Sequence, residues 1–153
     1  MNIWKFQSLI SRRLLMWAVT SIIIGWRWLR QPHPFRRGLG LHFTTWGLID
    51  ALIALGGARA AHKRRQHPQA LSPQTLRRET KKLRRLLWLN AGLDVGYIYG
   101  GWHLWRSRGA TDAHWRGQGI GIIIQGAFLL IFDCWHAWYT PQPPTISTKD
   151  SIK

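Results

Sequence analysis

Residues 120–139 read IGIIIQGAFLLIFDCWHAWY. The run is almost entirely apolar, and its roughly 20 residues suit a helix that crosses about 30 Å of hydrocarbon. Gln125 and Asp133 lie inside it. A carboxyl group in hydrocarbon costs about 3 kcal/mol or more unless it is paired, hydrogen-bonded or protonated. The run therefore indicates a membrane-spanning helix, and its own polar residues are the first functional candidates.

Three more apolar runs precede this one in the chain. They cover about residues 14–28, 39–61 and 86–105. The second contains Asp50 and the third contains Asp94, each near the middle of its run. The sequence thus predicts an all-α, polytopic membrane bundle of four transmembrane helices, folded as a single domain over residues 1–139.

Basic residues lie at or beyond the ends of these runs. The chain has 22 Lys and Arg against six acidic residues, for a net charge of +16. Ten of the basic residues fall between residues 59 and 85. Because cytoplasmic loops carry the excess of Lys and Arg, this distribution predicts that both termini and the central loop are cytoplasmic. The segment 140–153 is rich in Pro, Ser and Thr, and we expect a disordered cytoplasmic tail there.

The basic segment 59–85 is expected to contact the headgroups of anionic lipids. Contact with nucleic acid is the less favoured alternative, because no aromatic residues interleave with these charges. Ser72 followed by Pro73 predicts the start of a helix, with serine as its N-cap, that runs on into the third span. Most of the eleven Trp fall near span ends, as expected for residues that anchor a bilayer protein at its two interfaces.

The two halves of the chain resemble each other. The matched positions are Arg12-Arg13 with Arg84-Arg85, Gly25-Trp26 with Gly101-Trp102, Gly38 and Gly40 with Gly117 and Gly119, and Gly47 with Gly126. Their offsets drift from 72 to 79 residues, as small loop insertions would produce. The pattern suggests two repeated helical hairpins, related by a pseudo-two-fold axis along the membrane normal.

Small residues mark two faces for close packing. Gly92, Gly96 and Gly100 are spaced four apart on the third span, which allows another helix to approach closely. Gly47, Ala51, Ala54 and Ala58 form a similar stripe on the second span. Such faces serve either packing within the bundle or packing between protomers.

Polar residues within the spans fall on common helix faces. Asn90, Asp94 and Tyr97 share one face of the third span, and Gln125, Asp133 and His136 share roughly one face of the fourth. Asp50 and Asp94 lie at similar depth, since each residue adds about 1.5 Å along a helix. No Lys or Arg is available at that depth. Either some of these carboxyl groups are protonated, or a cation enters, or each carboxyl is held by hydrogen bonds that only pair helices.

The second half of the chain resembles a known family. The stretch Leu89–Tyr97, the Gly117-x-Gly119 pair and the stretch Gln125–Asp133 are similar to those of small bacterial four-helix integral membrane proteins of unknown function. The resemblance covers about residues 89–136. It implies a four-helix protein of the bacterial inner membrane whose signature residues are Asn90, Asp94, Tyr97, Gln125 and Asp133, and it implies no activity.

Three functional hypotheses follow from these patterns. The leading one is a site that binds or translocates a proton or a small solute, in a protein that would need a homodimer or a larger membrane complex to form a pathway. The others are a non-catalytic accessory subunit or scaffold, and an intramembrane enzyme, although the sequence favours a protein that is not an enzyme. No HExxH, CxxC, phosphate loop or nucleophile elbow is present, so we expect neither a metal nor a cofactor.

Overall fold

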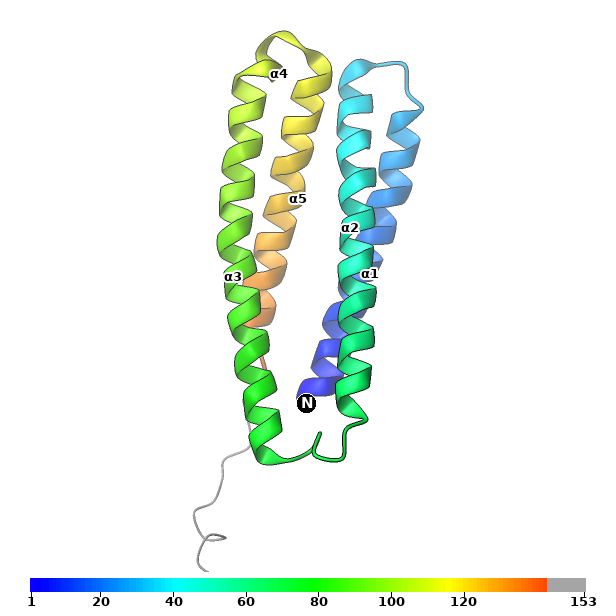
Figure 1. Cartoon of the computed structure of the whole chain (residues 1–153). Helices are drawn as coiled ribbons and strands as arrows, with labels where there is room; N and C mark the ends of the chain where they lie inside the picture. The colour runs from blue at the N-terminus through cyan, green and yellow to red at the C-terminus, as the bar shows by residue number, and fades with distance from the viewer. Residues whose placement is uncertain (143–153) are drawn as a thin grey trace, which may run out of the picture.

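The computed structural model describes residues 1–142 and is all-helical over that range (Figure 1). Its helices are α1 (Ile3–Leu29), α2 (Pro34–Arg65), α3 (Pro73–Arg106), α4 (Arg108–Thr111) and α5 (Ala113–Trp138). The predicted all-α class is therefore confirmed. Most of the expected tail, residues 143–153, lies outside the described residues.

Local capping explains where the long helices begin. Ser72 accepts a hydrogen bond from the Thr75 amide, and Pro73 occupies the first turn of α3, so the predicted helix start is confirmed. Residues 73–85 of the basic segment and the third apolar run form one continuous helix. Helix α5 begins where Asp112 accepts from the amides of His114 and Trp115. Helix α1 begins at Ile3, well before residue 14, because Asn2 caps it and no Gly or Pro interrupts the segment.

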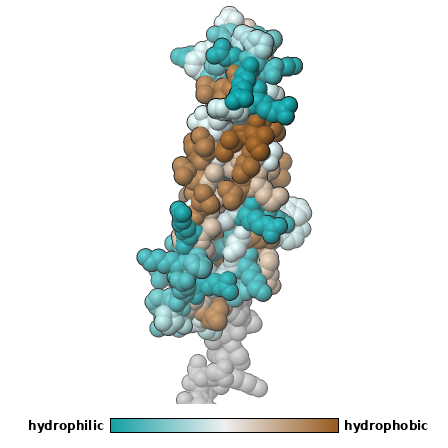
Figure 2. Space-filling view, turned by 90° about the vertical axis from the view of Figure 1, so that its right-hand side faces the viewer, coloured by the Kyte–Doolittle hydropathy of each residue, from teal (hydrophilic) through white to brown (hydrophobic). Residues whose placement is uncertain are grey.

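Three of the described helices are long and apolar enough to cross a membrane, namely α1, α2 and α5. Helix α3 has the length but not the composition, since its apolar part carries Asn90, Asp94 and several glycines. Apolar side chains form a band over the middle of the molecule, with hydrophilic side chains above and below it (Figure 2). The fold is thus that of a membrane protein with at least three candidate spans.

The long helices form two hairpins that lie side by side (Figure 1). Helix α1 packs along α2, helix α3 packs along α5, and α2 packs against α5 to join the hairpins. We call the end with the N-terminus and the α2–α3 turn the basal end, and the end with the other two turns the apical end. Both hairpins start at the basal end, which is the arrangement expected of a parallel repeat.

Glycines hold each hairpin together at equivalent places. In the first hairpin, Gly25 of α1 faces the Gly40 carbonyl of α2, so closely that no side chain would fit. In the second, Gly101 of α3 faces the Gly119 carbonyl of α5 in the same way. These are the residues that the sequence repeat pairs, so the matched positions hold equivalent contacts.

The contact between the hairpins repeats as well. A side chain at Gly38 of α2 would collide with the His114 carbonyl of α5. A side chain at Gly117 of α5 would collide with the Phe35 carbonyl of α2. His114 follows Phe35 by 79 residues, and Gly117 follows Gly38 by the same number. The same contact therefore occurs in both directions between α2 and α5, and it holds the two hairpins tightly together at the apical end.

The two predicted stripes of small residues behave differently. Gly47 packs against Ala18 and Ile22 of α1, and Ala54 is buried with Leu14 and Phe132. Gly92, Gly96 and Gly100 instead lie on the outer face of α3, where no other part of the described chain comes within 4 Å of an added Cβ atom. These three do not pack helices within this chain, because α3 turns its polar face inward, and packing between protomers stays a prediction.

Candidate functional site

A cavity of about 260 Å³ lies between α2, α3 and α5. Five of the seven sequence candidates line it, namely Asp50, Asp94, Asp133, Asn90 and Tyr97. Three acidic side chains from three different helices therefore surround one space. No Lys or Arg of the described residues lines this cavity, and the rest of its wall is apolar or aromatic.

Asp50 and Gln125 form the polar contact at the interface of α2 and α5. The Gln125 side-chain amide donates to Asp50 Oδ2 at 2.9 Å. Asp50 is 2 % exposed and Gln125 is fully buried. Asp50 therefore points into the bundle rather than toward the surface. The other amide atom, Gln125 Oε1, has no hydrogen-bond partner among the described residues.

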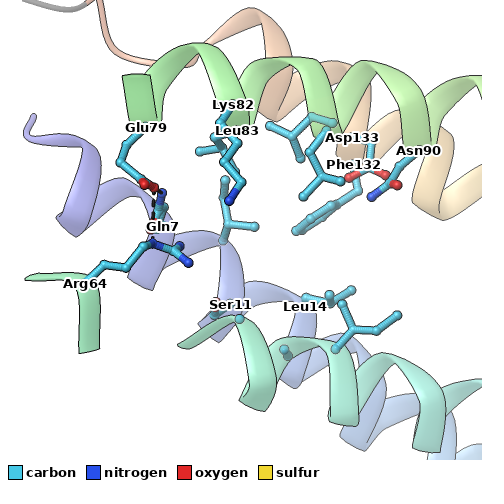
Figure 3. A pocket seen from close by; sticks show the side chains of 16 residues that line it. Gln7, Ser11, Leu14, Arg64, Glu79, Lys82, Leu83, Asn90, Phe132 and Asp133 are labelled. Carbon is cyan, nitrogen blue, oxygen red and sulfur yellow. Dashed lines mark hydrogen bonds and ion pairs between the residues drawn. The ribbon is translucent and has the colours of Figure 1, made fainter. Parts of the chain in front are cut away.

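Asn90 and Asp133 lie side by side at the basal side of the cavity (Figure 3). Asp133 is 7 % exposed, and the Asn90 side chain is near enough to interact with its carboxyl group. Asp94 lies one helical turn farther toward the apical end. Its Oδ2 atom is buried and has no hydrogen-bond partner among the described residues.

Aromatic rings form the apical side of the same cavity. Trp46 and Tyr97 both line it, and their rings stack with centroids 4.6 Å apart. The His42 ring stacks on the Trp46 ring, with their centroids 5.9 Å apart. Sequence reasoning missed Trp46 as a site residue. Its spacing of four before Asp50, together with Tyr97 three after Asp94, is the signal that would have found it.

A second cavity, of about 180 Å³, continues the first toward the basal end. Both cavities are lined by Leu14, Ile53, Phe132, Asn90 and Asp133. The second cavity then extends to a polar group at its far end (Figure 3). The acids thus lie beside two adjoining cavities, the second of which extends toward the basal end.

Glu79 of α3 organises that polar group. It accepts a hydrogen bond from Gln7 Nε2 of α1 at 3.4 Å and pairs with Arg64 Nε of α2 at 3.3 Å. These contacts join α1, α2 and α3 at the basal end of the smaller cavity. The Lys82 side chain also lines this end and reaches toward the space between the helices (Figure 3).

Two of the candidate residues do not line the larger cavity. Gln125 lies behind the cavity wall, where it donates a hydrogen bond to Asp50. His136 lies on another side of α5, where its Nδ1 atom donates to the Phe132 carbonyl at 2.6 Å and its Nε2 atom lies 3.2 Å from Arg13 Nη1. Although it shares a helix face with Asp133 by sequence spacing, contact with α1 takes its ring out of the site.

A comparison with known protein families finds one match. The family of unknown function DUF6992 matches residues 13–134, a range that contains every polar residue of the larger cavity. No curated protein and no solved structure matches the chain. The chemistry of the cavity is therefore the basis for assigning a function.

Proposed function

This chain belongs to the DUF6992 family, and we propose that it is a multi-pass membrane protein that binds a proton or a small cationic solute among Asp50, Asp94 and Asp133. The observation that carries the proposal is the composition of the larger cavity, which has three acids and no basic residue in its wall.

Electrostatics gives the reason. Carboxylates that are held near one another in a largely apolar wall repel each other and lose hydration. Gln125 relieves only part of this cost at Asp50, because a single amide donor does not neutralise a charge. A proton on at least one carboxyl group, or a positively charged ligand between them, removes the repulsion. Both outcomes make the cavity a site where positive charge is taken up and released.

The connectivity supports four spans. Helix α2 ends at the basal end and α5 begins at the apical end (Figure 1). If both cross the bilayer, the chain between them has to cross it as well, and α3 is the only long helix in that segment. The polar residues of α3 that lower its apolar character face the cavity rather than lipid.

The basic residues of segment 59–85 support a cytoplasmic basal end, with both termini on that side of a bacterial inner membrane. In that orientation the basic residues at the basal end lie at the level of anionic lipid headgroups. The smaller cavity then connects the acids to the cytoplasm, so that a proton or solute is exchanged from that side.

Infrared spectroscopy tests the proposal directly. We expect a carbonyl-stretch signal of a protonated carboxyl group near neutral pH in the purified protein, removed by one of Asp50→Asn, Asp94→Asn or Asp133→Asn. Asp112→Asn is the matched control, because Asp112 caps α5 outside the cavity and asparagine caps equally well. A spectrum without a protonated carboxyl, in a protein that also binds no cation, would contradict the proposal.

The contact between Asp50 and Gln125 favours one second candidate, a non-catalytic accessory subunit or scaffold in which buried polar residues only pair helices. That function predicts co-purification with a larger complex and loss of assembly in the Asp50→Ala or Asp133→Ala variant, which removes the hydrogen-bonding group. Proper assembly of these variants, with loss of the carboxyl signal, would exclude it.

A further inference from the structure

Building on that proposed function, we infer that the ligand of the larger cavity is a small organic cation, a protonated amine or guanidine that carries an apolar part. Failure of this inference would leave a proton as the exchanged species at the same site, so the two proposals are separable.

The placement of the acids disfavours a metal ion. Magnesium and calcium need several oxygen ligands at about 2.0–2.6 Å from one point. Among residues 1–142, no group of three or more His, Cys, Asp or Glu is placed to hold a metal ion. Asp50, Asp94 and Asp133 therefore line one cavity without converging on one point. A polyatomic cation can contact acids on different sides of the space at once.

The apolar wall favours a ligand with hydrocarbon. Six aliphatic or phenyl side chains line the cavity besides the polar ones. They are Leu14, Ile49, Ile53, Leu93, Leu129 and Phe132. An inorganic ion would lose water ligands beside these apolar side chains, which offer it no ligand atoms in return. A cavity of about 150 Å³ is enough for benzene, so about 260 Å³ has room for a larger molecule.

The aromatic side of the cavity adds recognition of a cation. Trp46 and Tyr97 lie about one turn to the apical side of Asp50 and Asp94, respectively. Indole and phenol rings attract an ammonium or guanidinium group that lies over their faces, and tryptophan does so most strongly. A ligand between these rings and the acids would use both kinds of contact.

An unpartnered acceptor in the cavity wall supplies the independent sign of a missing donor. Asp94 lines the cavity, and its Oδ2 atom is buried and accepts no hydrogen bond among the described residues. A buried acceptor without a donor is unfavourable. A ligand with N–H groups would satisfy Asp94 directly, and it would lessen the charge that Gln125 alone now stabilises at Asp50.

Isothermal titration calorimetry on the full chain in lipid nanodiscs tests the inference. The probes are butylammonium and butylguanidinium, with butanol as the neutral analogue and Na⁺, K⁺ and Mg²⁺ as the inorganic ones. We expect the two organic cations to bind in competition with each other, while butanol and the metal ions bind at least about tenfold more weakly, the difference that one charge-assisted contact supplies.

Variants connect binding to the cavity. Asp94→Asn is expected to weaken binding of the organic cations about tenfold or more, and Trp46→Leu about two- to fivefold, as loss of a cation–π contact predicts. The controls are Asp112→Asn and Trp88→Leu, the latter at an exposed position on the outer face of α3. If Asp94→Asn does not fold, Asp50→Asn replaces it, because asparagine retains a hydrogen-bond partner for Gln125.

Each of the following results would overturn the inference. Tighter binding of any inorganic cation than of both organic cations would do so, as would equal binding of butanol, or binding that Asp94→Asn and Trp46→Leu leave unchanged. A protonated carboxyl signal in a protein that binds none of the organic cations would reject the organic ligand and retain the proposed proton site. Absence of both signals would reject both proposals.

Discussion

Asp50 shows how a single residue is accommodated in this fold. Its carboxyl group is almost fully buried on α2, and one amide hydrogen bond from Gln125 is its direct support in the described chain. Hydrogen bonds between side chains in membrane proteins average well under 2 kcal/mol, so this one stabilises the helix pair without cancelling the cost of a buried charge. The residue is therefore held in place while its charge remains available to a ligand or a proton.

A double-mutant cycle measures that contact. We expect the Asp50→Ala and Gln125→Ala variants to show a coupling free energy of unfolding of about 1 kcal/mol, as for other buried side-chain hydrogen bonds. The pair Gln118 and His114, which lies 3.0 Å apart within α5, is the control and should couple by about 0.3 kcal/mol. Reversible unfolding in detergent gives both values. Equal coupling in the two pairs would mean that the buried contact has no special role.

Lys82 lines the basal end of the smaller cavity, where its charge opposes a cation that approaches from that side. Lys82→Glu is therefore expected to speed association of butylammonium by a few-fold at low salt, with less effect at high salt. Lys81→Glu makes the same charge change at an exposed neighbouring position outside the cavity wall. Stopped-flow binding compares the two. An equal change in both variants would assign the effect to overall charge rather than to this route.

The contacts between helices recur in the two hairpins, whereas the acidic residues of the cavity do not. The glycine contacts of α1 with α2 recur between α3 and α5. The position 76 residues before Asp94 is Ala18, however, and the position 79 residues before Asp133 is Ala54. Both alanines are buried. Two similar hairpins therefore make a repeated frame at the apical end, whereas Asp50 of the first hairpin and Asp94 and Asp133 of the second occupy positions that the repeat does not match.

The glycines that join α2 and α5 should be the most sensitive to substitution. Gly38→Ala places a methyl group against the backbone of α5, so we expect a loss of about 1–3 kcal/mol in the free energy of unfolding. Gly92→Ala is the matched control, because open space surrounds that position, and alanine there should be neutral or stabilise the helix by about 0.5–1 kcal/mol. Unfolding in detergent measures both. Tolerance of Gly38→Ala would mean that the hairpins are not held by this contact.

At the scale of the whole molecule, the sequence predicts the features that local residue patterns determine, such as the positions of the helices. Apolar runs and caps predicted where helices lie, and helix periodicity predicted the common face of Asn90, Asp94 and Tyr97 that lines the cavity. The rotation of a helix about its own axis depends on the helices that pack against it, so the pattern of a single sequence segment does not determine it. That is why the sequence did not predict that Asp50 contacts Gln125, that the glycine face of α3 is external, that Trp46 lines the cavity or that His136 lies outside it.

Cysteine labelling tests whether α3 crosses the bilayer. The one cysteine, Cys134, is replaced by serine, and single cysteines are then introduced by Pro32→Cys, Gln69→Cys and Ala110→Cys. All three positions are exposed, the first two between helices and the third in α4. Four spans predict that Pro32→Cys and Ala110→Cys react with a membrane-impermeant maleimide in intact cells, while Gln69→Cys reacts only after permeabilisation, since a basic loop stays in the cytoplasm. Protection of Ala110→Cys together with Gln69→Cys would place both ends of α3 on one side of the membrane, and the cavity between α2, α3 and α5 would then not form within a bilayer.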